Sequence, residues 1–372
     1  MRKLLLILLL ALIPGCGPSP TPLPIYLGHV ATTSGPTRAL GEQEVLGIRL
    51  AIEELTREGQ DRLGERPIVV KHADAHGQLD AIEGEAVRLV TISRVVALYG
   101  GNSIEEVNRL DRSLVPLLTP LGTRPRGLSQ LTFGIGIAPA AQAHALARFA
   151  ALDQGVRSMA IVMDDRREES RALAEAFEIE FHKALEEKHA GEKSAKPERV
   201  VFGKDANFSA LAQRMDAAKV QGVLFAGSAQ DFEQWCSALS SAEFLIFFGG
   251  EDGTVREPRL QSAFLTSAFA VDKELPKTGA FVQRFREAFK EEPDVHAALA
   301  YDGIRILVDA LRRAQNPGGE RFLEELRQTK DFPGLTGPLN FGADQHLRRP
   351  VFVGRMSGTR FEAVKRYDPP NP

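Results

Sequence analysis

Short apolar runs alternate with amphipathic helical patterns along most of the chain, and this alternation restricts the fold more than any other feature. In the first half, the predicted strands and helices span residues 25–30, 42–55, 68–70, 79–90, 95–99, 103–110 and 115–118. Each strand is short and continuously apolar, which is typical of parallel strands covered by helices on both faces. The first half therefore predicts one parallel α/β sheet.

The same rhythm returns in the second half of the chain. Strands are predicted at 159–163, 200–202, 223–226, 244–248 and 268–271, and helices at 141–152, 168–187, 208–218, 231–239, 277–291 and 297–314. With 372 residues the chain exceeds what one core usually holds. We therefore expect an α/β protein with two Rossmann-like lobes.

The N-terminus has the features of a targeting segment. Arg2 and Lys3 precede an apolar run, residues 4–13, that is too short to span a bilayer as a helix. Residues 13–16, Ile-Pro-Gly-Cys, resemble a bacterial lipobox, in which Cys16 would be lipidated. A plain secretory signal is the alternative. The proline-rich residues 17–24 predict an extended spacer, which favours the anchor.

The second cysteine, Cys236, has no partner if Cys16 carries lipid, so no disulfide is expected. Cys236 lies on a predicted helix, and we interpret it as a small packing residue rather than a nucleophile.

Ligands of open parallel sheets bind beyond the carboxyl ends of the strands, beside helix N-termini that suit a carboxylate. The first such junction, residues 33–44, reads TSGPTRALGEQE and resembles the first loop of the leucine/isoleucine/valine-binding protein family, the branched-chain amino-acid receptors of bacterial ABC transporters. Four further segments resemble that family in the same order, namely 74–90, 203–211, 297–306 and 337–341.

The resemblance implies the type 1 periplasmic binding protein fold, in which two Rossmann-like lobes with parallel sheets are joined by a three-crossing hinge. It implies a first lobe of residues 25–140 plus 273–333 and a second lobe of residues 141–272 plus 334–367. Residues 1–16 would be the signal peptide and 17–24 the spacer.

The family also implies where ligand contacts lie. Ser103 and Thr123 match the hydroxyl residues that hold the ligand's carboxylate, although Ser103 also begins a capping box and reads equally as a helix cap. In the second lobe, Glu251 matches the acid that pairs with the ligand's ammonium group, with Asp252 as the second choice.

At three positions where the family has aromatic residues in the pocket wall, this chain has other residue types. Leu40, Glu169 and Ser228 stand at those places, and all three are expected at the ligand site. Because aromatic walls are replaced and an acid is gained, the aliphatic preference of the family does not carry over. We expect a ligand that is larger, more polar or more cationic than an aliphatic amino acid, such as a polar amino acid or an amide-like compound.

Catalytic and cofactor motifs are not expected here. The sequence contains no Gly-x-Ser-x-Gly, no Gly-x-x-x-x-Gly-Lys-Ser/Thr and no His-Glu-x-x-His pattern, so no enzyme and no cofactor is predicted. His72 and His76 have a spacing that suits zinc only on a helix, and no metal is predicted. A formal net charge of −3 excludes the basic surface that nucleic-acid binding needs.

The sequence thus predicts a monomeric extracytoplasmic solute-binding lipoprotein, anchored to a bacterial membrane, that delivers a small polar ligand to an ABC permease. The alternative is a ligand-sensing or envelope-regulatory lipoprotein of the same fold without transport.

Overall fold

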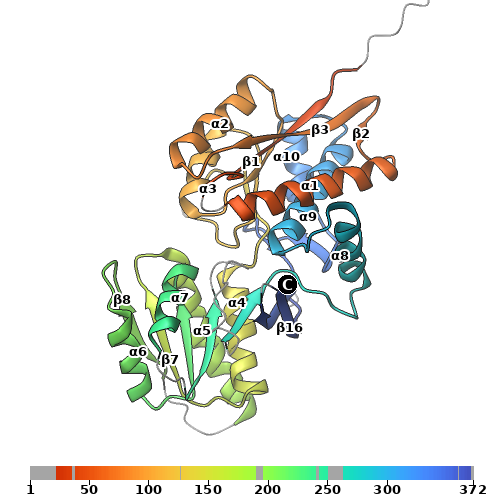
Figure 1. Cartoon of the computed structure of the whole chain (residues 1–372). Coiled ribbons are helices and arrows are strands. Elements are labelled where there is room, and N and C mark those ends of the chain that lie inside the picture. The colour runs from red at the N-terminus through yellow and green to blue at the C-terminus, as the bar shows by residue number, and fades with distance from the viewer. Residues whose placement is uncertain are drawn as a thin grey trace, which may run out of the picture.

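A computed structural model describes residues 22–35, 38–125, 127–189, 196–239, 243–249, 263–358 and 360–369. Residues 1–21, with the predicted signal peptide and Cys16, lie outside this range, as do Glu251 and Asp252. The described chain forms two lobes, one above the other in Figure 1. None of the helices in these ranges is both long and apolar enough to cross a bilayer.

The first lobe is built on a six-stranded sheet with the order β2-β3-β1-β4-β5-β6. Its elements are β1 (Ile25–Ala31), α1 (Arg38–Arg57), β2 (Arg62–Leu63), β3 (Arg66–Asp74), α2 (Leu79–Thr91), β4 (Leu98–Gly100), α3 (Ile104–Leu110), β5 (Leu117–Thr119) and β6 (Thr132–Gly134). All neighbours pair in parallel except β2, which pairs antiparallel with β3.

The second lobe is built on a seven-stranded sheet with the order β16-β15-β11-β10-β9-β7-β8. Its elements are α4 (Pro139–Arg148), β7 (Met159–Asp164), α5 (Glu168–Lys188), β8 (Glu198–Phe202), α6 (Phe208–Ala217), β9 (Gly222–Ala226), α7 (Ala229–Ala238), β10 (Leu245–Gly249), β11 (Ala263–Ser267), β15 (Val351–Ser357) and β16 (Arg360–Tyr367). A π-helical turn, Phe149–Asp153, extends α4. The last two strands pair antiparallel.

Between β11 and β15 the chain returns to the first lobe as α8 (Pro276–Phe289), α9 (Val295–Ala314) and α10 (Gly319–Arg327). Helices α8 and α9 contact α1, and α10 packs on α9 (Figure 1). Helix α9 packs closely on α1, because a Cβ atom at Gly47 would come within 2.2 Å of the Ala297 carbonyl oxygen. Most of α9 is buried, so it forms the core of this lobe.

The lobes are joined where the chain crosses between them three times, after β6, after β11 and before β15. A small sheet of β12 (Phe332–Gly334), β13 (Gly337–Phe341) and β14 (Leu347–Arg348) precedes the third crossing. Beside it, the guanidinium of Arg349 lies 3.2 Å from the carboxylate of Asp302 on α9, and each side chain is only 3% exposed. This buried ion pair ties the third crossing to the first lobe.

The structure confirms the two-lobed α/β prediction and corrects it in places. The strand predicted at 268–271 is wrong, because the paired strand is β11, five residues earlier. Strands β2, β6 and β12–β16 and helix α10 were not predicted as elements. Cys236 is buried in the second lobe's core, as a packing residue would be.

Candidate ligand-binding cleft

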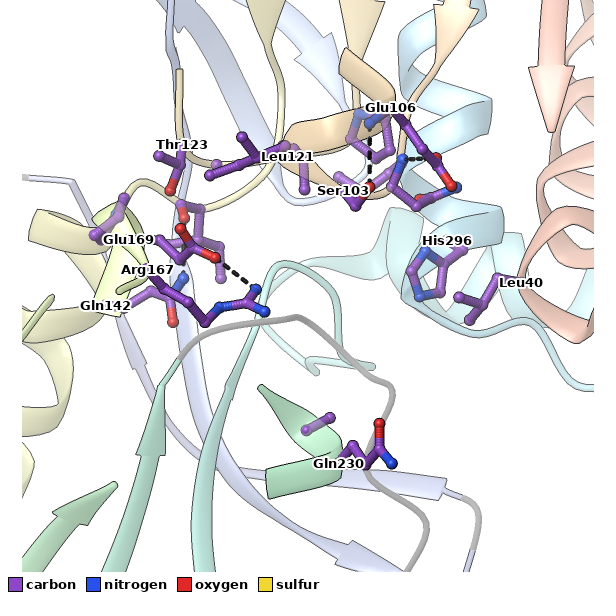
Figure 2. Close-up of a pocket in the computed structure, with 18 of the residues that line it drawn as sticks. Leu40, Ser103, Glu106, Leu121, Thr123, Gln142, Arg167, Glu169, Gln230 and His296 are labelled. Carbon is purple, nitrogen blue, oxygen red and sulfur yellow. Dashed lines mark hydrogen bonds and ion pairs between the residues drawn. The ribbon is translucent and has the colours of Figure 1, made fainter. Parts of the chain in front are cut away.

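A cavity of about 610 Å³ opens between the two lobes, and Figure 2 shows the side chains that face it. From the first lobe and its crossings it is lined by Thr32, Ala39, Leu40, Gly41, Asn102, Ser103, Ile104, Glu106, Pro120, Leu121, Gly122, Thr123, Ile137, His296 and Leu299. From the second lobe it is lined by Pro139, Gln142, Arg167, Glu169, Leu173, Ala229, Gln230 and Glu233. The cavity therefore has polar groups on both lobes.

Ser103 is fixed at the wall of the first lobe because it caps α3. Its hydroxyl oxygen accepts a hydrogen bond from the Glu106 backbone N–H at 3.2 Å, which confirms the predicted N-cap. The Glu106 carboxylate accepts from the Asn102 N–H at 2.7 Å, one residue earlier than in a standard capping box. Burial raises the pKa of Glu106 above its usual range.

Behind this wall lies a polar cluster that starts at Asn102, is buried at Glu44 and His29, and reaches the surface at His72. The Asn102 side-chain amide donates to Glu44 Oε1 at 3.2 Å, and the other Glu44 oxygen lies 3.3 Å from His29 Nε2. His29 Nδ1 in turn lies 2.9 Å from His72 Nδ1. Burial raises the pKa of Glu44 to about 7, and it lowers the pKa of His29 to about 3 and that of His72 to about 4.

His296 stands at the start of α9, next to Leu40 in Figure 2. The Asp294 side chain caps α9 by accepting from the backbone N–H groups of His296 at 2.9 Å and Ala297 at 3.1 Å. The cap fixes the backbone so that the imidazole faces the cavity, where the residue is 6% exposed.

Thr123 lies on the loop that follows β5. The Thr119 hydroxyl donates to the Gly101 carbonyl oxygen at 2.7 Å, which ties this loop to the loop before α3. Gly122 packs against the first crossing, since a Cβ there would lie 1.8 Å from the Ile137 carbonyl oxygen. The two loops that carry Ser103 and Thr123 are thus held to one another.

On the second lobe, the wall is charged. Arg167, the N-cap residue of α5, forms an ion pair with Glu169 at 2.5 Å, and Figure 2 shows the pair at the cavity. Glu169 is 17% and Arg167 32% exposed at the side chain. Gln142 lines the cavity from α4 and donates to the Ile137 carbonyl oxygen at 3.1 Å.

The structure brings four of the predicted ligand residues together at this cavity, namely Leu40, Ser103, Thr123 and Glu169. Ser228 instead caps α7 by accepting from the Asp231 N–H at 3.1 Å, while its neighbours Ala229 and Gln230 line the cavity. Glu251 and its alternative Asp252 lie outside the described residues.

Sequence reasoning missed Asn102, Glu106, Arg167 and His296 as residues of the cavity wall. A signal existed for His296, because Asp294 two residues earlier is a strong N-cap residue that moves the helix start to include the histidine. For Arg167 no such signal exists, since charged residues at a helix start are usually solvated.

Two α/β lobes joined by three crossings and enclosing a polar cavity define a two-lobed binding protein. A family model described as periplasmic binding protein matches residues 24–360. The chain therefore belongs to the periplasmic binding protein family, as the resemblance in the sequence predicted.

The individual relatives that match this chain do so at low sequence identity. The Leu/Ile/Val-binding protein BraC3 of Rhizobium johnstonii is 28% identical over 214 residues, which cover 55% of this chain and 54% of that protein, so the match spans about half of its length. The crystal structure of a leucine-binding protein LivK of Thermotoga maritima superposes with a TM-score of 0.75 at 21% identity, over 93% of this chain and 99% of that one.

A second solved structure, the branched-chain amino acid transporter substrate-binding protein LivJ of Streptococcus pneumoniae in complex with isoleucine, gives a TM-score of 0.74 at 22% identity, covering 93% of this chain and all of that chain. Both structures share the type 1 periplasmic binding fold with this chain.

Proposed function

We propose that the protein is an extracytoplasmic solute-binding protein whose lobes close on a small polar ligand, an amino acid or amide-like compound, and deliver it to an ABC permease. The observation that carries the proposal is the cavity lined from both lobes. Its volume of about 610 Å³ is in the range of small-molecule sites. A ligand that contacts both walls favours the closed state, which a permease can recognise.

The lining groups suit a ligand that carries both charges of an amino acid. The hydroxyls of Ser103 and Thr123 can donate to a carboxylate. Among the described lining residues, the acids Glu106, Glu169 and Glu233 outnumber the arginines, of which Arg167 is the one present. An ammonium group is therefore favoured elsewhere in the cavity. Glu251 stays our proposed ammonium partner from the second lobe.

The wall favours binding over catalysis. A serine nucleophile donates its hydroxyl proton to a base, whereas the hydrogen bond that Ser103 makes is one that its oxygen accepts from the Glu106 N–H, and no described residue accepts its proton. The named relatives are binding proteins as well, and one of them, LivJ, is a transporter substrate-binding protein.

Membrane attachment through lipid on Cys16 belongs to the same proposal. The anchor would hold both lobes near the permease through the spacer of residues 17–24. Intact mass of the natively produced protein tests it, because lipidation adds the mass of diacylglycerol to a chain that starts at Cys16. A chain cut elsewhere, without lipid, contradicts the anchor but not ligand binding.

Calorimetry and thermal unfolding with the twenty amino acids, their amides and small carboxylic acids test the proposal. A ligand at a hundredfold excess over its dissociation constant stabilises the native state by about 2.7 kcal/mol. The double variant Ser103→Ala with Thr123→Val should bind at least tenfold more weakly, while His189→Leu, at the far end of α5, should bind normally. If no such compound binds, or the double variant binds unchanged, the proposal is wrong.

Transport is separated from sensing by uptake of the identified ligand. A strain lacking the protein should lose high-affinity uptake if the protein serves a permease. Normal uptake together with a changed envelope response would instead favour the regulatory alternative.

A further inference from the structure

His296 is a buried polar side chain of the cavity wall that makes no hydrogen bond to the described residues through its ring. The residue is 6% exposed, and neither ring nitrogen has a hydrogen-bond partner among the described residues. A neutral imidazole has one donor and one acceptor, and leaving them unpaired in a buried place costs free energy. Such a group is expected to find its partner in whatever fills the cavity.

The neighbouring polar groups of this wall already have partners within the protein. The Asn102 amide donates to Glu44, and the Glu106 carboxylate accepts from the Asn102 N–H. Ser103 accepts the capping bond at α3. These groups hold the wall in place, whereas the ring of His296 is positioned by the Asp294 cap and left available to a ligand.

None of the other described residues is hydrogen-bonded to the imidazole. The cavity surface of this lobe also includes the apolar side chains of Leu40, Ile104, Leu121 and Leu299, which offer no donor or acceptor. In Figure 2 the ring of His296 lies beside Leu40 and faces the open centre of the cavity. A purely aliphatic ligand side chain would bury the ring nitrogens unpaired.

The acidic residues of this wall further restrict the class of ligand that can bind there. Asp294 adjoins His296 in the helix cap, the buried carboxyl of Glu44 is close enough to interact with it electrostatically, and Glu106 lines the same wall. The described lining of this lobe contains no arginine or lysine, so an acidic side chain of the ligand would lose water beside these carboxyl groups without gaining a cation. An uncharged ligand group that both donates and accepts hydrogen bonds does not carry this cost of an unpaired charge.

We propose that His296 selects ligands that carry an uncharged hydrogen-bonding group, a carboxamide or a hydroxyl, at the first-lobe wall of the cavity. The proposal rests on the proposed solute-binding function and specifies its ligand class. It predicts that polar neutral amino acids are preferred over both aliphatic and acidic ones of the same size.

Matched ligands test the selection by calorimetry on the full mature chain. L-asparagine, L-leucine and L-aspartate have similar sizes, as do L-glutamine, L-methionine and L-glutamate. We expect the amide of at least one set to bind at least tenfold more tightly than its aliphatic and acidic counterparts. Tighter binding of the aliphatic or acidic member in both sets would overturn the proposal.

Variants of His296 test whether this residue causes the preference for amide ligands. His296→Leu should reduce the amide-over-aliphatic ratio at least tenfold, whereas His296→Gln, which keeps a donor and an acceptor, should retain most of it. His189→Leu serves as the surface control. An unchanged ratio in His296→Leu, with a melting temperature showing that it is folded, overturns the assignment. If no amino acid or carboxylic acid binds the wild-type protein at all, the proposed function itself is wrong and this inference with it.

Discussion

The amide of Asn102 donates a hydrogen bond to Glu44 Oε1 at 3.2 Å, and this contact joins a residue of the cavity wall to a carboxyl that is completely buried. The wall is therefore supported by a group that is expensive to ionise. Burial holds the pKa of Glu44 at about 7, so the folded protein keeps this proton in mildly acidic solution, where an unfolded chain releases it.

The first prediction is the pH dependence of stability. The folded pKa of Glu44, about 7, lies above the ordinary value of 4.5, so the stability that this proton contributes is lost as pH rises from about 4.5 to 7. Glu44→Gln cannot ionise. Its unfolding free energy relative to wild type should therefore rise across this window, by up to roughly 3 kcal/mol.

Urea unfolding of both proteins at several pH values between 4.5 and 8 measures this difference. His29 and His72, whose folded pKa values are about 3 and about 4, destabilise both proteins as pH falls below 6.5, so their effect largely cancels. Glu42→Gln, on the exposed side of α1, is the matched control and should show a constant difference. A constant difference for Glu44→Gln would refute the prediction.

The second prediction concerns the cap at Ser103. Ser103→Ala removes the acceptor for the Glu106 N–H and should lower the unfolding free energy by about 1 kcal/mol. Ser103→Thr keeps the hydroxyl oxygen, so its unfolding free energy should fall by less. Both changes are measured by urea unfolding without ligand, which separates the cap from any ligand contact; equal losses in the two variants would argue against the cap.

The sequence could predict both sheets because parallel strands buried on two faces are short and continuously apolar. It misplaced β11 because two short apolar runs, residues 263–265 and 268–271, are separated only by Thr266 and Ser267, so periodicity could not tell which run is paired. Pairing of Phe247 with Phe264 and of Leu265 with Gly354 locates it instead. Such register depends on strands distant in sequence.

The family resemblance placed Leu40, Ser103, Thr123 and Glu169 at the cavity, and Ser103 also has its own capping signature. Arg167 belongs to a charged stretch whose side chains could equally face water, and only the facing lobe makes it a cavity residue. Side-chain roles that depend on two lobes meeting cannot be read from local pattern.

The third prediction is steric. A Cβ atom at Gly122 would lie 1.8 Å from the Ile137 carbonyl oxygen, so Gly122→Ala must push the Thr123 loop away from the first crossing. We expect a loss of about 1–3 kcal/mol in unfolding free energy and clearly weaker ligand binding. Gly84→Ala, on α2 with open space around its Cβ position, should be neutral or slightly stabilising. If both variants behave alike, the loops are not held as closely as described.

The last prediction concerns the ion pair beside the third crossing. Arg349→Met leaves the Asp302 carboxyl, which is 3% exposed, buried without its cation, although it still accepts a hydrogen bond from the Leu335 N–H at 3.1 Å. Removing one partner of a buried pair typically costs about 3–5 kcal/mol.

Replacing both partners should cost less than replacing one, because burial of an unpaired charge is the main penalty. Asp302→Asn combined with Arg349→Met should therefore recover much of the stability lost in Arg349→Met. The control is Arg348→Met, one residue before Arg349, which removes an exposed ion pair with Asp344. This variant should change the unfolding free energy by less than about 1 kcal/mol. Urea unfolding of the four proteins decides the matter: a double variant no more stable than Arg349→Met would mean that the arginine stabilises the crossing through packing rather than through its charge.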